Sequence, residues 1–394
     1  VFFVLVTPIA SADDRQAEFH ALIEAHTHPL TWDGASLGGE GADWLASEIA
    51  EAHYFMIGER HATADIAVVS AQLFRVAAGK DYTHAVLEIG PVIGGELQRF
   101  LAEQGPDALT NGDADPAFLN AIAFFGFQEE RVFVADVHRA GMTSAGLDHE
   151  FIFSGDFHRA RLKTAAQTPA QREAVAALDA IAAEQPYYVG SGEPAIYEAI
   201  EAAFAPHDEE VMRETARALR ITNAIYRPFV VGGPVSWSNV ERENYVKSNW
   251  YQLVRAIAGP GELGPRMAFK WGGTHSAPAV DENARIMLGT FVEDWATVHG
   301  VTSFNLGIDC NAGQSLSTGG SEFVPQDCVS WFLSGGGMQN STEEAEERLF
   351  TRHLSEKAGP ILIDFRPVRE HLSRWTFLTP EERRWVAGFD AYLA

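Results

Sequence analysis

The chain has 394 residues, of which 46% are hydrophobic and 11% aromatic, and this composition is typical of a folded globular protein rather than a disordered one. Its 54 acidic and 29 basic residues give a formal net charge of −25 at pH 7. A field of this sign repels phosphate backbones, so we expect no nucleic-acid partner.

The first residues, VFFVLVTPIASA, have the pattern of the end of a secretory signal peptide. An apolar run over residues 1–9 is followed by Ala-Ser-Ala, a small-x-small cleavage pattern, and then by two aspartates. We interpret residues 1–12 as a signal-peptide remnant and predict a periplasmic or secreted protein. A short N-terminal strand and an uncleaved anchor are the alternatives. No other stretch approaches the roughly 20 apolar residues of a membrane span, so we expect no integral span.

Two cysteines, Cys310 and Cys328, lie in a Gly/Ser-rich segment. In an oxidising compartment a disulfide between them would close this loop, whereas free thiols would fit a reducing one. Their spacing matches no zinc motif.

Residues 54–89 predict a β-α-β unit. The apolar run 54–57 is typical of a buried strand, and residues 64–78 have the spacing of a helix with one apolar face. Residues 85–87 are again apolar before Gly90-Pro91 ends the element. Such a unit implies parallel strands joined by a right-handed crossover.

The remaining elements alternate in the same way. We expect helices near 94–104 and 117–127, a strand at 131–138 and a similar segment at 151–158. An Ala/Glu-rich region at about 165–230 predicts a helical insertion, with helices near 170–184, 194–204 and 208–226. Ser238 would cap a helix that runs to residue 257. The pattern ends with a short strand near Lys270, a helix at 281–298, strands at 301–308 and 361–365, and a last helix with an edge strand.

This alternation predicts an α/β fold with a mainly parallel central sheet flanked by helices. We expect one domain, residues 13–394, that carries the α-helical insertion. The sequence does not indicate an oligomeric state.

Ionisable residues follow four of the predicted strands. They are Glu59 and His61, Glu88, Asp136 and His138, and Lys270 and His275. The carboxyl ends of parallel strands share one edge of a sheet, where ligands bind, so we expect these groups to converge there. Arg242, on the helix after Ser238, would add a cation.

These residue types suit hydrolysis by an activated water. A histidine held by a carboxylate can deprotonate water, and a second histidine with Lys or Arg can stabilise the developing oxyanion. Metal binding is the alternative, with Glu59, His61, Glu88 and His275 as the candidate ligands. The motifs H-E-x-x-H, C-x-x-C and the P-loop are absent.

The ordered set of motifs over residues 50–394 resembles one superfamily, which contains the erythromycin esterase-like proteins, the heme-binding ChaN and the TraB/Tiki group. Gly58-Glu59-Arg60-His61 is similar to its first-strand Gly-Glu-x-His signature, and Glu88 to its second-strand glutamate. The segment from Arg242 to Asn249 is similar to its helix motif, and the segment from Lys270 to His275 to a later strand that ends in a histidine. Residues 363–366 and 389–392 resemble the C-terminal strands.

The resemblance implies an exported hydrolase that cleaves an ester or amide of a small molecule or peptide. Its cleft would carry Glu59, His61, Glu88, Arg242 and His275. His61 would be the general base, positioned by Glu59 or Glu88, while Lys270 and His275 would polarise the carbonyl. The esterase reaction requires no cofactor. The alternative is a ChaN-like protein without catalysis that binds heme or a divalent metal.

Overall fold

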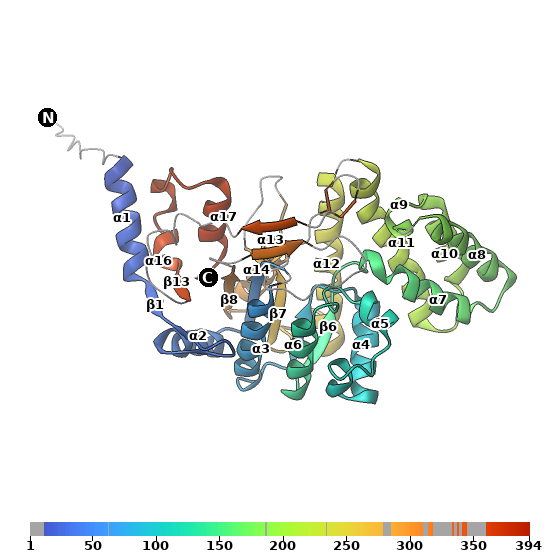
Figure 1. Cartoon of the computed structure of the whole chain (residues 1–394), viewed down its shortest axis with the longest axis horizontal. Helices are drawn as coiled ribbons and strands as arrows, with labels where there is room; N and C mark the ends of the chain where they lie inside the picture. The colour runs from blue at the N-terminus through green and yellow to red at the C-terminus, as the bar shows by residue number, and fades with distance from the viewer. Residues whose placement is uncertain are drawn as a thin grey trace.

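The computed structural model describes residues 12–61, 63–185, 187–233, 235–278, 285–309 and 360–394, together with four short strands between 314 and 344. An eight-stranded sheet with the order β1-β13-β14-β8-β4-β7-β5-β6 forms its centre (Figure 1). Every adjacent pair from β14 to β6 is parallel, and only β13 runs against its neighbours. The predicted α/β fold with a mainly parallel sheet is confirmed.

The sheet strands are short, and their bounds are β1 (Thr27–Pro29), β4 (Tyr54–Glu59), β5 (His84–Leu87), β6 (Thr143–Gly146), β7 (Met267–Gly272), β8 (Ser303–Ile308), β13 (Ile361–Asp364) and β14 (Ala391–Leu393). Among the described residues, six further strands form three two-stranded sheets, which pair β2 (Thr31–Trp32) with β3 (Leu37–Gly38), β9 (Gln314–Ser317) with β12 (Ser341–Glu344), and β10 (Leu333–Ser334) with β11 (Gly337–Met338).

The side chains of β4 alternate between the two faces of the sheet, and each face has its own hydrophobic cluster. Tyr54 and Met56 pack with Trp250 and Val292 on one face, whereas Phe55 and Ile57 belong to the cluster on the other. Side chains of a strand alternate between faces, and both faces here are apolar because helices cover both. The strand is therefore buried along its whole length, as the continuous apolar run predicts.

Four helices cover the first face: α2 (Glu40–Glu51), α3 (Ala64–Ala78), α4 (Pro91–Gln104) and α6 (Gln128–Arg139). On the second face lie α12 (Val235–Ala258) and α14 (Leu288–Val298). Beside the strands β13 and β14, the helices α1 (Ala12–Ala25), α16 (Arg366–Arg369) and α17 (Pro380–Gly388) and the 3-10 turn η3 (Leu372–Arg374) pack around Trp375.

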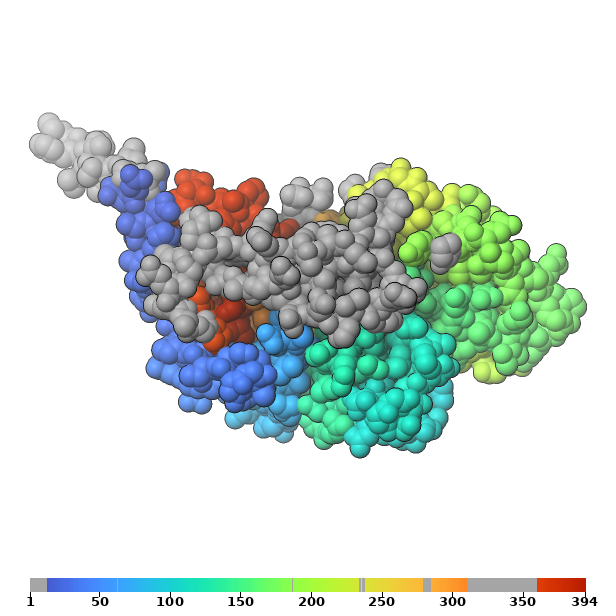
Figure 2. Space-filling model, viewed as in Figure 1, coloured from blue at the N-terminus to red at the C-terminus, as the bar shows by residue number. Residues whose placement is uncertain are grey.

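The helical insertion has a core of its own. It contains α7 (Gly155–Ala165), α8 (Pro169–Glu184), α9 (Tyr188–Ser191), α10 (Pro194–Phe204) and α11 (Glu210–Val231). Their buried side chains, including Leu178, Phe204 and Leu219, form a cluster separate from the clusters of the sheet. In Figure 2 these green helices form the end of the molecule opposite α1. The three helices predicted between 170 and 226 are present, the last one extending to Val231.

Several sequence-based predictions of elements were wrong. Residues 131–138 are part of helix α6 and not a strand, because Phe133, Val134 and Val137 lie on one helical face that packs against the core. The segment 151–158 is a 3-10 turn, η2 (Ile152–Ser154), followed by α7, and of the helix expected at 117–127 only α5 (Pro116–Ala121) forms. The 3-10 turn η1 (Pro106–Leu109) precedes α5.

Three boundaries also differ from prediction. Ser238 lies inside α12, which begins at Val235, and its hydroxyl donates to the Val235 carbonyl instead of capping the helix. The last strand, β14, lies between β13 and β8 and is not an edge strand. Helix α14 begins at Leu288, not 281.

The predicted signal peptide, except Ala12 at the start of α1, lies outside the described residues, as do Cys310 and Cys328. No helix among the described residues is long and apolar enough to span a bilayer.

Candidate active site

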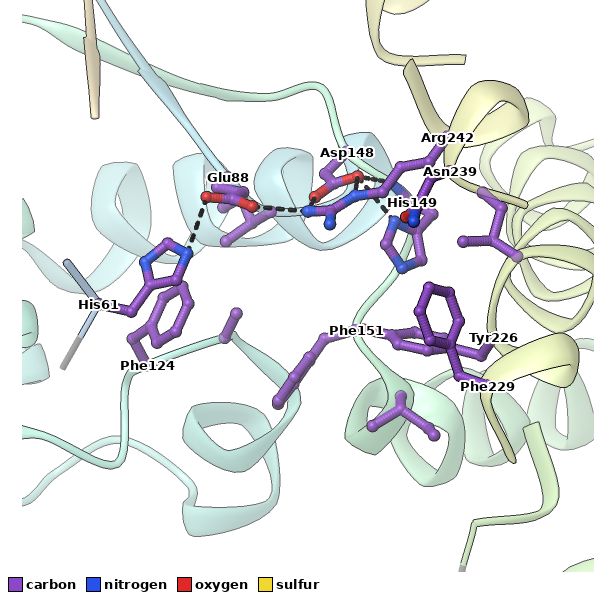
Figure 3. A pocket seen from close by; sticks show the side chains of 14 residues that line it. His61, Glu88, Phe124, Asp148, His149, Phe151, Tyr226, Phe229, Asn239 and Arg242 are labelled. Carbon is purple, nitrogen blue, oxygen red and sulfur yellow. Dashed lines mark hydrogen bonds and ion pairs between the residues drawn. The ribbon is translucent and has the colours of Figure 1, made fainter. Parts of the chain in front are cut away.

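A cavity of about 310 Å³ lies at the carboxyl edge of the sheet, between the strand ends and the helical insertion (Figure 3). Its polar wall comes from the ends of β4, β5 and β6 and from helix α12: His61, Glu88, Asp148, His149, Asn239 and Arg242. Of the groups expected to converge at this edge, His61 and Glu88 line the cavity, whereas Lys270, His275, Asp136 and His138 do not.

His61 lies between two carboxylates. Its Nδ1 is 3.1 Å from Glu59 Oε1, and its Nε2 is 3.3 Å from Glu88 Oε2. Burial lowers the pKa of His61, but the charges of Glu88 and Glu59 outweigh burial, so the pKa lies above its ordinary value. With an acceptor at each ring nitrogen, the protonated imidazolium is the form that this geometry favours.

Behind His61, Lys270 joins two buried carboxylates. Its Nζ lies 2.6 Å from Glu59 Oε2 and 2.8 Å from Glu130 Oε1. Burial raises the pKa of Glu59, but Lys270 and His61 outweigh it and hold the pKa below its usual range; burial raises the pKa of Glu130. Lys270 does not line the cavity. It therefore fixes Glu59 rather than reaching a substrate carbonyl, contrary to the role we expected from the sequence.

Arg242 connects the acidic residues of the polar wall. Its Nε and Nη2 donate to the two oxygens of Asp148 at 3.0 and 2.5 Å, and Nη2 also donates to Glu88 Oε1 at 2.6 Å. This is the bidentate pairing that the planar guanidinium favours. Burial raises the pKa of Asp148, but Arg242 and His149 outweigh burial and hold it well below its usual range. Burial also raises the pKa of Glu88, but His61 and Arg242 outweigh burial and hold it below its usual range, so Asp148 and Glu88 are both charged at neutral pH.

His275 supports Arg242 from behind. Arg242 Nη1 lies 3.0 Å from His275 Nε2, and because a guanidinium can only donate, this nitrogen accepts. The proton of the imidazole is then on Nδ1, which donates to Glu243 Oε1, while Glu243 Oε2 accepts from the Leu288 amide at 3.0 Å. His275 is a positioning residue here, and its lone pair is not directed at the cavity.

Gly272 allows β7 to approach His61 and Glu88. Its N–H donates to Glu88 Oε2 at 2.6 Å. A Cβ at this position would lie 2.6 Å from His61 Nε2 and 3.3 Å from the same Glu88 oxygen. Only glycine fits between these groups.

The sequence-based reasoning missed Asp148 and His149, which follow β6. Strand β6, Thr-Ser-Ala-Gly, is short and has little apolar character, and its last residue must be glycine because a Cβ at Gly146 would lie only 2.3 Å from the Gly90 carbonyl oxygen. The apolar stretch 131–138, which precedes it, has the stronger strand pattern but forms helix α6. The consecutive Asp148-His149-Glu150 was the available signal. Asp136 and His138 are outside the site, and Asp136 pairs with Arg75 and Arg139.

Aromatic side chains form the opposite wall. Phe124, Phe151, Tyr226 and Phe229 line the cavity, the last two from helix α11 of the insertion. The Phe124 ring stacks on His61, with ring centroids 4.6 Å apart. Its φ of 69° is in the left-handed region, which is costly for a bulky residue and typical of functional sites. This wall suits an apolar or aromatic group of a substrate.

The donor set does not fit a metal ion. The carboxylates of Glu59 and Glu88 are paired with Lys270 and Arg242, and the lone pair of His275 is engaged by Arg242. Among the described residues, no three His, Cys, Asp or Glu side chains are grouped so that they could hold a metal. Ligands for a metal would first have to lose their cationic partners.

These features define an α/β protein with a histidine–carboxylate cavity at the carboxyl edge of its sheet, and solved structures share its fold. A protein described as a succinoglycan biosynthesis protein aligns with a TM-score of 0.59 and 16% identity over 96% of both chains. A Bacillus cereus protein aligns with a TM-score of 0.55 and 12% identity, also over 96% of both. A mutant of the erythromycin esterase EreC in its open conformation aligns with a TM-score of 0.61 and 12% identity, over 93% of this chain and 96% of that one.

The chain therefore has the erythromycin esterase-like fold that its motifs indicate. No protein-family model and no curated protein matches it. At 12% to 16% identity the similarity establishes the fold and does not transfer an activity.

Proposed function

We propose that this chain is a hydrolase that cleaves an ester or amide bond in the cavity, with a histidine–carboxylate pair activating the attacking water. The observation that carries the proposal is the continuous chain of contacts from Glu59 through His61, Glu88 and Arg242 to Asp148 along one wall. Such a wall can transfer protons and stabilise an oxyanion without a side-chain nucleophile.

The cavity also suits the kind of substrate proposed. Its charged wall faces a wall of aromatic rings, so a carbonyl group can lie at the charges while an apolar acyl or alcohol part packs on Phe124 or Phe229. A small molecule or a peptide side chain fits a cavity of about 310 Å³. We propose that the reaction needs no cofactor, since the carboxylates already have cationic partners in the chain.

The first experiment is a screen of ester and peptide substrates with the wild-type protein and with His61→Ala. Loss of a proton-transfer residue typically costs about 10²- to 10⁴-fold in rate. The matched control is His371→Ala, since His371 is exposed and does not line the cavity. Full turnover by His61→Ala on an amide or an unactivated alkyl ester that the wild type cleaves would contradict the proposal.

The alternatives of heme binding and of a metal requirement can be tested on the same protein preparation. Heme titration that produced a Soret band dependent on His61 would favour a heme-binding protein instead. Metal analysis of protein purified without chelators, and activity after chelation, would test whether a divalent ion is required. Export, which we also propose, is tested by N-terminal sequencing of protein recovered from the periplasm or medium.

A further inference from the structure

His149 is a second imidazole in the cavity, and its hydrogen bonding differs from that of His61. Its Nδ1 lies 2.7 Å from Asp148 Oδ1, which also accepts from the His149 amide at 2.8 Å. The side chain is 4% exposed. Within the described part of the chain, its Nε2 is buried and has no hydrogen-bond partner. A buried polar atom without a partner is costly and calls for a functional explanation.

The surroundings of His149 determine which ring nitrogen carries the proton. Asp148 is charged because it is held by Arg242, so it accepts and His149 Nδ1 donates. A second titratable neighbour is Tyr226 on α11, whose ring is 4.6 Å from that of His149. Burial raises the pKa of Tyr226, so its phenol stays neutral. The Nε2 of His149 therefore presents a free lone pair.

The two imidazoles stand at the two ends of one chain of contacts. The order is His61, Glu88, Arg242, Asp148, His149, and Figure 3 shows all five on the same wall of the cavity. His61 has a carboxylate at each nitrogen, which favours two protons on its ring. His149 has one carboxylate, at Nδ1, so in its neutral form the proton lies on Nδ1 and Nε2 is the acceptor. The site thus contains a proton donor and a proton acceptor together.

We propose that His149, oriented by Asp148, is the general base of this site, and that His61 acts at neutral pH as its general acid. This inference rests on the proposed hydrolase function and assigns its proton transfers. It places the base on a residue that no sequence motif indicated.

The steps balance as a simple hydrolysis. His149 Nε2 takes a proton from water, the water oxygen bonds to the carbonyl carbon, and the carbonyl electron pair moves to its oxygen. The oxyanion then re-forms the carbonyl, the bond to the leaving oxygen or nitrogen breaks, and that atom takes a proton from His61 Nε2. The products are a carboxylic acid and an alcohol or amine. Proton exchange with solvent restores both imidazoles.

Ring ¹⁵N chemical shifts of histidine recorded from pH 5 to 9 test the assignment without a substrate. The expected result is that the neutral form of His149 has its proton on Nδ1 and none on Nε2, and that His61 keeps protons on both nitrogens to a pH above the ordinary range of histidine. Asp148→Asn is expected to change the His149 pattern and leave that of His61. A neutral His149 with its proton on Nε2, or a His61 that loses its second proton at or below the ordinary range, would overturn the inference.

Kinetics with p-nitrophenyl butanoate and ethyl butanoate test the roles, because the first leaving group needs little protonation and the second needs it. His149→Ala should lower kcat/KM on both esters by a similar factor, about 10²-fold or more, with partial rescue by added imidazole. His61→Ala should affect the ethyl ester more. His371→Ala is the control, and thermal unfolding checks that each variant folds.

The results of these kinetics distinguish a failure of the roles assigned to His149 and His61 from a failure of the proposed hydrolase function. An active wild type whose His149→Ala variant keeps activity within threefold, or loses it only on the ethyl ester, would overturn the inference alone. A wild type that hydrolyses no ester or amide would overturn the proposed function, and the base role of His149 with it.

Discussion

At the scale of single residues, the protonation of each histidine in the site depends on which groups contact its two ring nitrogens. His61 meets two, His149 meets one, and His275 accepts from Arg242. In the roles proposed above, histidine is an acid at position 61, a base at position 149 and a positioning group at position 275. These differences come from hydrogen-bond partners and not from residue type.

The raised pKa of His61 makes part of the stability depend on pH. A folded-state pKa above the unfolded value of about 6.5 stabilises the protein fully below that pH, and this contribution is lost as pH rises through the folded pKa. We expect the difference in unfolding free energy between wild type and His61→Gln to be largest below pH 6. It should shrink at higher pH. Urea unfolding from pH 5 to 9 measures it, and a difference that grew with pH would contradict the raised pKa.

Arg242 should not tolerate lysine. An ammonium group cannot reproduce the bidentate contact with Asp148 together with the contact to Glu88. We expect Arg242→Lys to lower kcat/KM at least tenfold, and Arg242→Met to cost about 3 kcal/mol of stability because it leaves buried carboxylates unpaired. Urea unfolding and steady-state kinetics give both values. Wild-type behaviour of the lysine variant would show that the bidentate geometry is dispensable.

At the scale of elements, helices and strands pack so closely at several places that only glycine fits between them. A Cβ at Gly58 of β4 would lie 2.3 Å from the Ser276 hydroxyl of helix α13 (Gly273–Ser276) and 2.5 Å from the Phe389 ring. Gly94 of α4 packs in the same way on the backbone of Gly146 in β6. The helices can then hold the strand ends close together, which brings Glu59, Glu88 and Asp148 to one edge.

Gly272→Ala tests this packing at the site itself. The added methyl group would displace His61 from Glu88, so we expect a large loss of activity with only modest loss of stability. The matched control is Gly95→Ala in α4, where a Cβ meets nothing within 4 Å and the helix should gain about 0.5–1 kcal/mol. Activity assays and thermal melts of both variants make the comparison. An active Gly272→Ala protein would mean that the His61–Glu88 contact is not needed.

At the scale of the whole molecule, the insertion is both a separate core and a wall of the cavity. Helix α11 carries Leu219 into the insertion core and Tyr226 into the cavity, and it packs against α12, which carries Arg242. Changes inside the insertion can therefore reach the substrate site through α11.

Leu178→Ala, in the centre of the insertion core, should cost about 2–5 kcal/mol of stability because Leu178 is fully buried. Hydrogen exchange should speed up first in α8 and α10, while amides of β4 and β7 stay protected, and KM should rise more than kcat falls. If exchange increased equally in the sheet and the insertion, the two cores would instead unfold as one unit.

The sequence alone determined the strand–helix alternation, the insertion, and Glu59, His61, Glu88, Arg242 and His275 as a group. Local apolar runs and the shared edge of parallel strands indicate Glu59, His61, Glu88 and His275, whereas Arg242, on a helix, joins the group through the family resemblance of its motif. It could not find β6, because a strand packed against glycines carries no apolar pattern, nor separate α6 from a strand over eight residues.

Only the tertiary structure decided what each polar group contacts. Lys270 is buried between Glu59 and Glu130, a residue 140 positions away, and Asp148 meets Arg242 from 94 positions away. Protonation and hydrogen-bond direction depend on such partners, and partners distant in the chain leave no local signal. Local sequence patterns therefore identify residues of the site, whereas the contacts made in the fold determine their charges and hydrogen bonds.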